Sequence, residues 1–170
     1  MNHLGGDLLN KSQNYNNDSN SLEDFLKWVK IQYEYLAHLN ASPFVEDHFE
    51  LYFRGVSNNL YEDIPSIFRN HRFIQNEEKF LQECLTRNPC DFTDEKSTFD
   101  ILVKMQHYGV PTRLLDITQE PLVALYFATR KDIASAEKGK VIAYFIKKKQ
   151  IYYPDSPIVA VISNLARQNH

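Results

Sequence analysis

The stretch Met105–Thr118, MQHYGVPTRLLDIT, lies between two apolar helical patterns and decides how the chain is interpreted. Gly109 and Pro111 end the first pattern, since glycine commonly caps a helix and proline cannot continue one. Within twelve residues the stretch carries an imidazole, a phenol, a guanidinium, a carboxylate and a hydroxyl, from His107, Tyr108, Arg113, Asp116 and Thr118. Apolar residues separate these groups, so any that are buried must bond with a ligand or with one another. The stretch therefore predicts a site and not a spacer.

A second short segment, Phe49–Gly55, carries another candidate group. Its residues alternate around β-forming side chains and stop at a glycine, which predicts a strand that ends at Arg54. A guanidinium in that position can leave the sheet edge and present its donors to a phosphate or carboxylate. Gly55 would leave room for a close ligand. The alternative is that Arg54 pairs with a carboxylate at the edge of the core, such as Asp116.

The central stretch also has a purely structural interpretation. Asp116 could form a salt bridge with Arg113 or Arg54, Thr118 could cap the next helix, and His107 could complete the end of the previous one. Ion-pair networks of this kind also occur away from active sites. The sequence leaves the two interpretations open.

Hydrophobic periodicity predicts the remaining elements. Helices are expected from Ser21 to before Pro43, over residues 77–85, 93–108 and 121–128, and from Ser156 almost to the C terminus, with strands at 141–146 and 151–153. The last helix should bury a stripe formed by Ile158, Val161, Ile162 and Leu165. Because the elements show no regular βαβ alternation, we expect a single α+β domain with a small mixed β-sheet flanked by helices. Residues 1–20 are expected to be a disordered N-terminal arm, followed by the domain at 21–170.

Bulk composition excludes several classes of protein. A chain of 170 residues with 43% hydrophobic content can bury a core of its own. Cys84 and Cys90 lack the spacing of zinc ligands, so we expect reduced thiols and no metal site. With no apolar run of membrane-spanning length and no signal peptide, a cytoplasmic protein without membrane contact is predicted. The net charge of −3 argues against unspecific nucleic-acid binding, although residues 101–170 carry 10 Lys/Arg against 5 Asp/Glu and could face an anion.

Three blocks in order, Tyr52–Gly55, Gln106–Thr118 and Pro121–Ala128, resemble the FRG domain family, a bacterial and phage module named for its Phe-Arg-Gly signature. The resemblance covers roughly residues 50–168. Ile117 departs from it, because the family usually has an aromatic residue between the Asp and the Thr. Members also tend to continue where this chain ends, so the chain is expected to be either a fragment or a naturally short, C-terminally truncated version.

A more distant likeness is to ADP-ribosyltransferases of the arginine-serine-glutamate class. It implies that Arg54 holds a phosphate of NAD and that Asp116-Ile117-Thr118 replaces the usual Ser-Thr-Ser. Those enzymes also need a late glutamate, and no glutamate follows Glu137 in this chain. The likeness therefore lacks one of its three defining residues.

These observations lead to two hypotheses of different class. In the first, the two motifs form a cleft for a nucleotide-like anion, with NAD as the candidate cofactor, and the N-terminus of the helix at Pro121 contributes to the site. Arg54, Gly55, Tyr108, Arg113 and Thr118 would bind the ligand, and His107 and Asp116 would act in glycosidic-bond cleavage or ADP-ribosyl transfer. In the second, the same residues are a structural hydrogen-bond network in a non-catalytic module that binds a protein partner.

Overall fold

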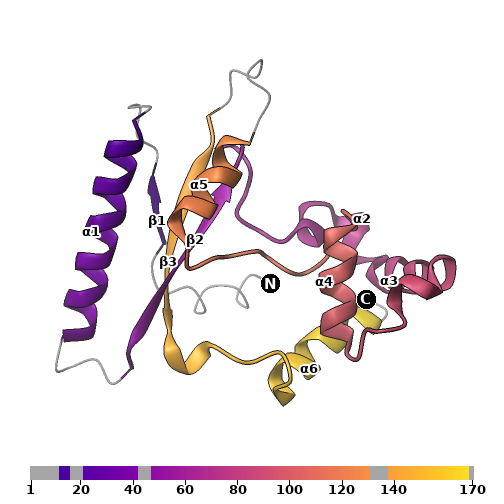
Figure 1. Ribbon diagram of the computed structural model, residues 1–170. Coiled ribbons are helices and arrows are strands. Elements are labelled where there is room, and N and C mark those ends of the chain that lie inside the picture. The colour runs from indigo at the N-terminus through magenta and orange to yellow at the C-terminus, as the bar shows by residue number, and fades with distance from the viewer. Residues whose placement is uncertain (1–11, 16–20, 42–46, 131–137, 169–170) are drawn as a thin grey trace. The chain divides into compact units, whose positions relative to one another are not determined.

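The computed structural model describes residues 12–15, 21–41, 47–130 and 138–168, and its elements confirm the predicted α+β class (Figure 1). In chain order they are β1 Ser12–Tyr15, α1 Leu22–Ala41, β2 Phe49–Val56, η1 Ser66–Arg69, α2 His71–Ile74, α3 Glu77–Arg87, η2 Pro89–Phe92, α4 Thr98–His107, α5 Pro121–Thr129, β3 Lys140–Lys147, η3 Lys148–Gln150, α6 Pro157–Asn164 and η4 Leu165–Arg167. They divide into two compact units that the sequence did not predict. The first comprises the chain up to Tyr61 together with Asp116–Ile151, and the second comprises Glu62–Leu115 together with the chain from Tyr152.

The sheet belongs to the first unit and has the strand order β1-β3-β2. Both pairings are antiparallel, so the prediction of a mixed sheet is wrong in this respect. The strand expected at 151–153 does not form, and the chain turns through η3 after β3 instead. Its place beside β3 is taken by β1, which falls within the arm that was expected to be disordered. That expectation is corrected for residues 12–15, and the rest of the arm lies outside the described residues.

The two faces of the sheet carry different side chains, as the two-residue period of a strand requires. One face is apolar and contacts α1 and α5; its buried residues are Leu51, Phe53, Val141, Ala143 and Phe145, which pack with Phe25, Val29, Ala124 and Ala128 of the helices. The opposite face holds a smaller cluster around Ile142 and Tyr144, with Tyr52 partly buried beside it. The register pairs Tyr52 with Tyr144 and Arg54 with Ile142, so Arg54 lies on this second face.

Helix α1 confirms the first predicted helix. The Oγ of Ser21 accepts a hydrogen bond from the backbone N–H of Asp24 (3.3 Å), as expected of an N-cap. Phe25 and Val29 are buried on the sheet, and Trp28 stacks edge-on to Phe53 with ring centroids 6.1 Å apart. None of the helices in the described residues is long and apolar enough to span a bilayer.

The second unit is helical, and its core lies between α3, α4 and η4. The buried residues are Leu81, Phe92, Ile101, Leu102, Met105 and Ala166. Helix α4 starts five residues later than predicted, because η2 precedes it and Ser97 and Asp100 form a capping box at its beginning. It ends as predicted at Gly109, whose φ of 79° suits glycine. The N–H groups of Gly109 and Val110 donate to Gln106 and Met105 (2.9 and 3.0 Å), which completes a Schellman motif.

Helix α6 forms as predicted, and the Oγ of Ser156 accepts a hydrogen bond from the N–H of Val159 at its start. The prediction of which side of this helix is buried is wrong. The four stripe residues Ile158, Val161, Ile162 and Leu165 are 38–67% exposed, whereas Ser163 and Ala166 are buried. A polar anchor explains the difference. The Thr98 hydroxyl of α4 donates to Asn164 (2.7 Å) and accepts from Nε of Arg167 (2.8 Å). These bonds orient Asn164 and Arg167, and not the predicted apolar stripe, toward α4.

Candidate functional site

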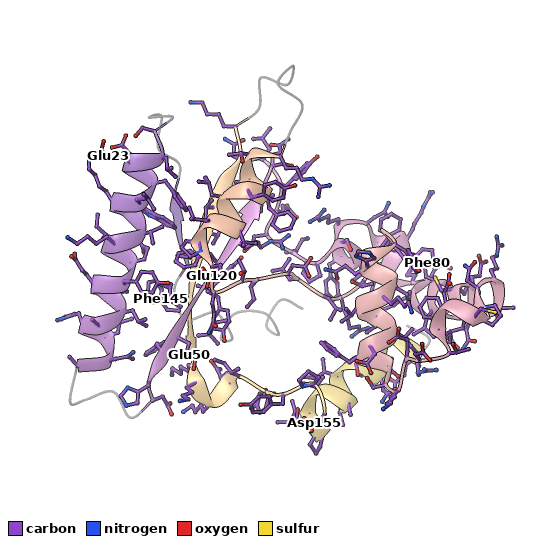
Figure 2. The ribbon with its side chains drawn as sticks, in the orientation of Figure 1. Glu23, Glu50, Phe80, Glu120, Phe145 and Asp155 are labelled. Atoms are coloured by element: carbon purple, nitrogen blue, oxygen red, sulfur yellow. The ribbon has the colours of Figure 1, made fainter. Side chains whose placement is uncertain are left out.

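The candidate residues fall into both units of the chain. Arg54, Gly55, Asp116 and Thr118 belong to the first unit, and Figure 2 draws the side chains of the described residues as sticks, with Glu50 and Glu120 of this unit labelled. His107, Tyr108 and Arg113 belong to the second unit.

The first unit joins two segments that are far apart in the sequence. Phe53 and Thr118 form an antiparallel bridge in which each backbone N–H donates to the other's carbonyl (2.6 and 2.8 Å). Next to this bridge, Nη1 of Arg54 donates to the carbonyl oxygen of Asp116 (2.8 Å). The Phe-Arg-Gly segment and the Asp-Ile-Thr segment thus lie side by side, and a backbone carbonyl fixes the direction of the Arg54 guanidinium.

Thr118 was predicted to cap α5, but it does not occupy the N-cap position. Helix α5 has Glu120 at its N-cap, without a side-chain capping bond, and the Thr118 hydroxyl instead accepts from the N–H of Glu120 (3.1 Å). Because bridged residues point to the same side of a sheet, Thr118 lies on the face of Phe53, opposite to that of Arg54. The carbonyl of Glu120 already accepts from the N–H groups of Val123 and Ala124 (3.1 and 3.3 Å). The start of α5 and the Arg54 side chain are therefore on different faces of β2.

Gly55 is surrounded by the backbone of α5. A Cβ atom at this position would lie 1.7 Å from the carbonyl oxygen of Ala124 and 2.8 Å from the nitrogen of Ala128. Gly139, just before β3, is in the same situation, with a Cβ only 2.0 Å from the carbonyl oxygen of Ala128. The two glycines and the two alanines let the helix lie directly on the strands. The absence of a side chain at Gly55 thus makes room for α5, whereas the sequence suggested that it made room for a ligand.

Two residues that sequence reasoning missed share the face of Arg54. Tyr52 donates its phenol proton to Oε2 of Glu50 (3.0 Å), and Nε2 of Gln119 donates to the same oxygen (3.4 Å). Burial raises the pKa of Tyr52, and the hydrogen bond to the Glu50 carboxylate raises it further. The period of two along β2 could have revealed this group, because Glu50, Tyr52 and Arg54 are alternate residues of one strand. We call Glu50, Tyr52 and Arg54 the polar row of β2.

In the second unit, His107 and Tyr108 lie at the end of α4. Both are exposed, Tyr108 by 56%, and their ring centroids are 6.1 Å apart at an angle of 56°. An exposed imidazole and phenol that are neighbours in this way can contact a ligand, donate a proton or accept one. The local reason for their exposure is the Schellman motif, which turns the chain immediately after them.

Arg113 has a specific protein partner. Its Nε donates to Oε1 of Glu77 (2.9 Å) and its Nη2 donates to Oε2, so that the two side chains form a bidentate ion pair. The side chains of Glu77 and Arg113 are only 1% and 11% exposed. The structural interpretation had Asp116 form a salt bridge with Arg113 or Arg54, whereas Arg113 pairs with Glu77 and Arg54 donates to the backbone carbonyl of Asp116. The arrangement with Glu77 explains Arg113 through the fold alone, since a buried guanidinium requires a carboxylate beside it.

Thr112 also has a structural explanation. It is fully buried, its N–H donates to the Ser66 hydroxyl (3.0 Å), and its own hydroxyl donates to Oε1 of Gln106 (2.6 Å). Its carbonyl accepts from the N–H of Ile67 (3.1 Å). These bonds attach the Val-Pro-Thr-Arg turn to η1 and to the end of α4. Within the second unit, Thr112 and Arg113 thus stabilise the fold, and His107 and Tyr108 are exposed polar groups of the central stretch.

Metal chemistry has no visible basis in the described part of the chain. No group of three or more His, Cys, Asp or Glu side chains is arranged to hold an ion there. Cys84 and Cys90 are free thiols, and burial raises the pKa of Cys84.

The architecture so far defines an α+β module in which an aromatic-Arg-Gly strand receives a small-residue helix on one face and carries a partly buried polar row on the other. The family model of the FRG domain matches residues 49–137, just over half of the chain, and this chain belongs to the FRG domain family. The matched range contains β2, the central stretch and α5 and ends before β3. Searches of curated proteins and of solved structures each return no match.

Proposed function

We propose that the first unit binds a nucleotide-like anion through Arg54. The observation that carries the proposal is the fixed direction of the Arg54 guanidinium, which donates to the Asp116 carbonyl from a face that also presents a phenol and a carboxylate. Guanidinium groups held in one direction suit phosphate, because their planar donors match two phosphate oxygens. NAD is the candidate ligand that the sequence suggests, and ADP-ribosyl transfer or glycosidic-bond cleavage would be the corresponding reactions.

The roles of the other candidates follow from their surroundings. Asp116 is exposed and adjacent to Arg54, so its carboxylate is a candidate acceptor of a ligand proton. His107 and Tyr108 are the candidates of the second unit, where both are exposed. Gly55, Arg113 and Thr118 are better explained by packing, by the ion pair with Glu77 and by the bond to Glu120.

Isothermal titration of the full chain with NAD, ADP and inorganic pyrophosphate tests the proposal. Arg54→Gln shortens the side chain and removes its charge but leaves a polar group, and we expect it to weaken binding by roughly 10- to 150-fold, the equivalent of one hydrogen bond to a charged group. Arg87→Gln is a matched control, because Arg87 is an exposed arginine paired with Glu83 in the second unit. A wild-type chain that binds none of the three compounds would refute the proposal.

A second candidate function is a protein-interaction module, and the surface of α5 favours it. Leu122, Val123, Tyr126 and Phe127 are 43–57% exposed on this helix, although Ala124 and Ala128 of the same helix are buried on the sheet. Several exposed apolar residues on one short element are typical of a surface that meets a partner. A second copy of this chain is the partner that can be tested directly. Sedimentation velocity should then show self-association in the wild type and a monomer in the double variant Val123→Ser/Phe127→Ser.

A further inference from the structure

We propose that Glu50, supported by Tyr52 and Gln119, binds the sugar hydroxyl groups of a ribonucleotide whose phosphate is held by Arg54. This inference rests on the proposed function and deepens it, because it selects ribonucleotides from among all anionic ligands. It concerns a carboxylate that precedes the Phe-Arg-Gly segment and is labelled on β2 in Figure 2.

The spacing of the polar row suits a ligand with two different ends. Alternate residues of a strand point to the same face and are about 6.5–7 Å apart, so Glu50 and Arg54 are separated by roughly 13 Å of backbone with Tyr52 between them. The Glu50 carboxylate is directed toward the Tyr52 phenol that donates to it, and the Arg54 guanidinium is directed toward the Asp116 carbonyl, so the two groups face a ligand from separate ends of the row. A diphosphate and the ribose joined to it would lie along this row, with the phosphates at the Arg54 end and the sugar hydroxyls at the Glu50 end.

Hydrogen bonding gives the Glu50 carboxylate a fixed orientation. Tyr52 and Gln119 both donate to Oε2, at 3.0 and 3.4 Å. In the part of the chain that the structure describes, no group donates to Oε1. Two protein donors thus hold Oε2 of Glu50 in place. Oε1 remains able to accept a hydrogen bond from a hydroxyl group of a ligand.

The charges along the row decide which ligand chemistry fits. An ionised carboxylate accepts hydrogen bonds only, and it repels a phosphate. Arg54, in contrast, donates only. A ligand that satisfies both must carry an anion at one end and hydroxyl donors at the other, and a ribonucleotide has both, since two vicinal hydroxyls are attached to the sugar beside the phosphate. A simple dianion such as pyrophosphate satisfies Arg54 alone.

The test compares three probes by isothermal titration of the full chain: ADP, 2′,3′-dideoxy-ADP and inorganic pyrophosphate. We expect the wild type to bind ADP at least tenfold more tightly than the dideoxy compound. Glu50→Gln should weaken ADP binding at least tenfold and should change pyrophosphate binding by less than twofold. Tyr52→Phe, which removes one anchor of the carboxylate and retains the ring, should weaken ADP binding by about threefold to fivefold.

The outcomes separate the two proposals. Equal affinity of the wild type for ADP and its dideoxy analogue overturns the sugar-binding role of Glu50 and leaves the Arg54 proposal in place, and this comparison needs no variant that could misfold. If Glu50→Gln binds ADP as tightly as the wild type does, the sugar-binding role of Glu50 is likewise overturned and the Arg54 proposal is kept. If the wild type binds neither ADP nor pyrophosphate, the phosphate site at Arg54 fails and the sugar site fails with it.

Discussion

Replacing Gly55 by alanine is the sharpest test of how α5 lies on the sheet. The added Cβ would be 1.7 Å from the carbonyl oxygen of Ala124, whereas ordinary van der Waals contact begins at 3.4 Å. The helix must therefore retreat by roughly 1.7 Å, or the strand must bend away from it. The three nearest contacts of the new methyl group would all be with backbone atoms, which cannot rotate aside as a side chain would.

The cost can be bounded from known core substitutions. Overpacking by one methyl group typically costs about 1–3 kcal/mol, and a clash with a helix backbone belongs at the upper end of that range. For a chain of this length, each kcal/mol lowers the melting midpoint by about 2–4 °C, so Gly55→Ala should melt roughly 6–12 °C below the wild type. Thermal denaturation followed by circular dichroism measures this shift.

Two companion variants identify the cause. Gly139→Ala should be destabilised similarly, since its Cβ would lie 2.0 Å from the carbonyl oxygen of Ala128. Adding Ala124→Gly to Gly55→Ala should not restore the melting midpoint, because the obstructing atom is a carbonyl oxygen and not the alanine methyl group. A Gly55→Ala variant that melts within about 2 °C of the wild type, or a rescue by Ala124→Gly, would refute the close packing of α5 on β2.

Three further predictions concern other parts of the structure. Glu77→Ala should lower the free energy of unfolding by about 3–5 kcal/mol, because it leaves the buried Arg113 guanidinium without its carboxylate; an unchanged urea midpoint would contradict this. At Gly109, whose φ is 79°, substitution by valine should cost about 1–2 kcal/mol and substitution by asparagine distinctly less, and equal melting of the two variants would exclude the proposed helix cap. The raised pKa of Tyr52 means that its stabilising contribution is complete below the unfolded-state pKa near 10 and is lost as the pH rises through the higher folded-state value. Urea midpoints measured at about pH 8 and pH 11 should therefore fall further in the wild type than in Tyr52→Phe, and parallel declines would show that Tyr52 ionises alike in both states.

Local signals in the sequence were sufficient for most element boundaries. The capping residue Ser21, the serine before Pro157 and the glycine at 109 each mark a helix end that the structure confirms. The alternation at Phe49 and the apolar run at Val141 mark the two long strands, which are each slightly longer than predicted. These features depend on neighbours within a few residues, and such information is present in a single sequence.

Features that depend on tertiary partners were not predictable in the same way. Glu77 stands in the first turn of α3, where an acidic residue normally faces solvent and interacts with the helix dipole, and nothing in its neighbourhood indicates that it pairs with Arg113. Helix α6 has an apolar stripe that indicates burial, yet the Thr98 hydroxyl anchors Asn164 and Arg167 and thereby selects another face. In both cases a polar contact between distant segments overrides a local pattern.

The Phe-Arg-Gly segment shows why membership of the family does not by itself assign a chemistry. Three consecutive strand residues point to alternate faces, so Phe53 and Gly55 lie on the side of α1 and α5, and Arg54 lies on the other. Phe53 is fully buried in the apolar cluster and Gly55 is required by the backbone of α5, so packing explains both of these residues. Packing does not explain why a guanidinium, a phenol and a carboxylate should follow one another along the opposite face. A function of this unit should therefore be sought at Glu50, Tyr52 and Arg54, where the requirements of the fold are weakest and the polar chemistry is most concentrated.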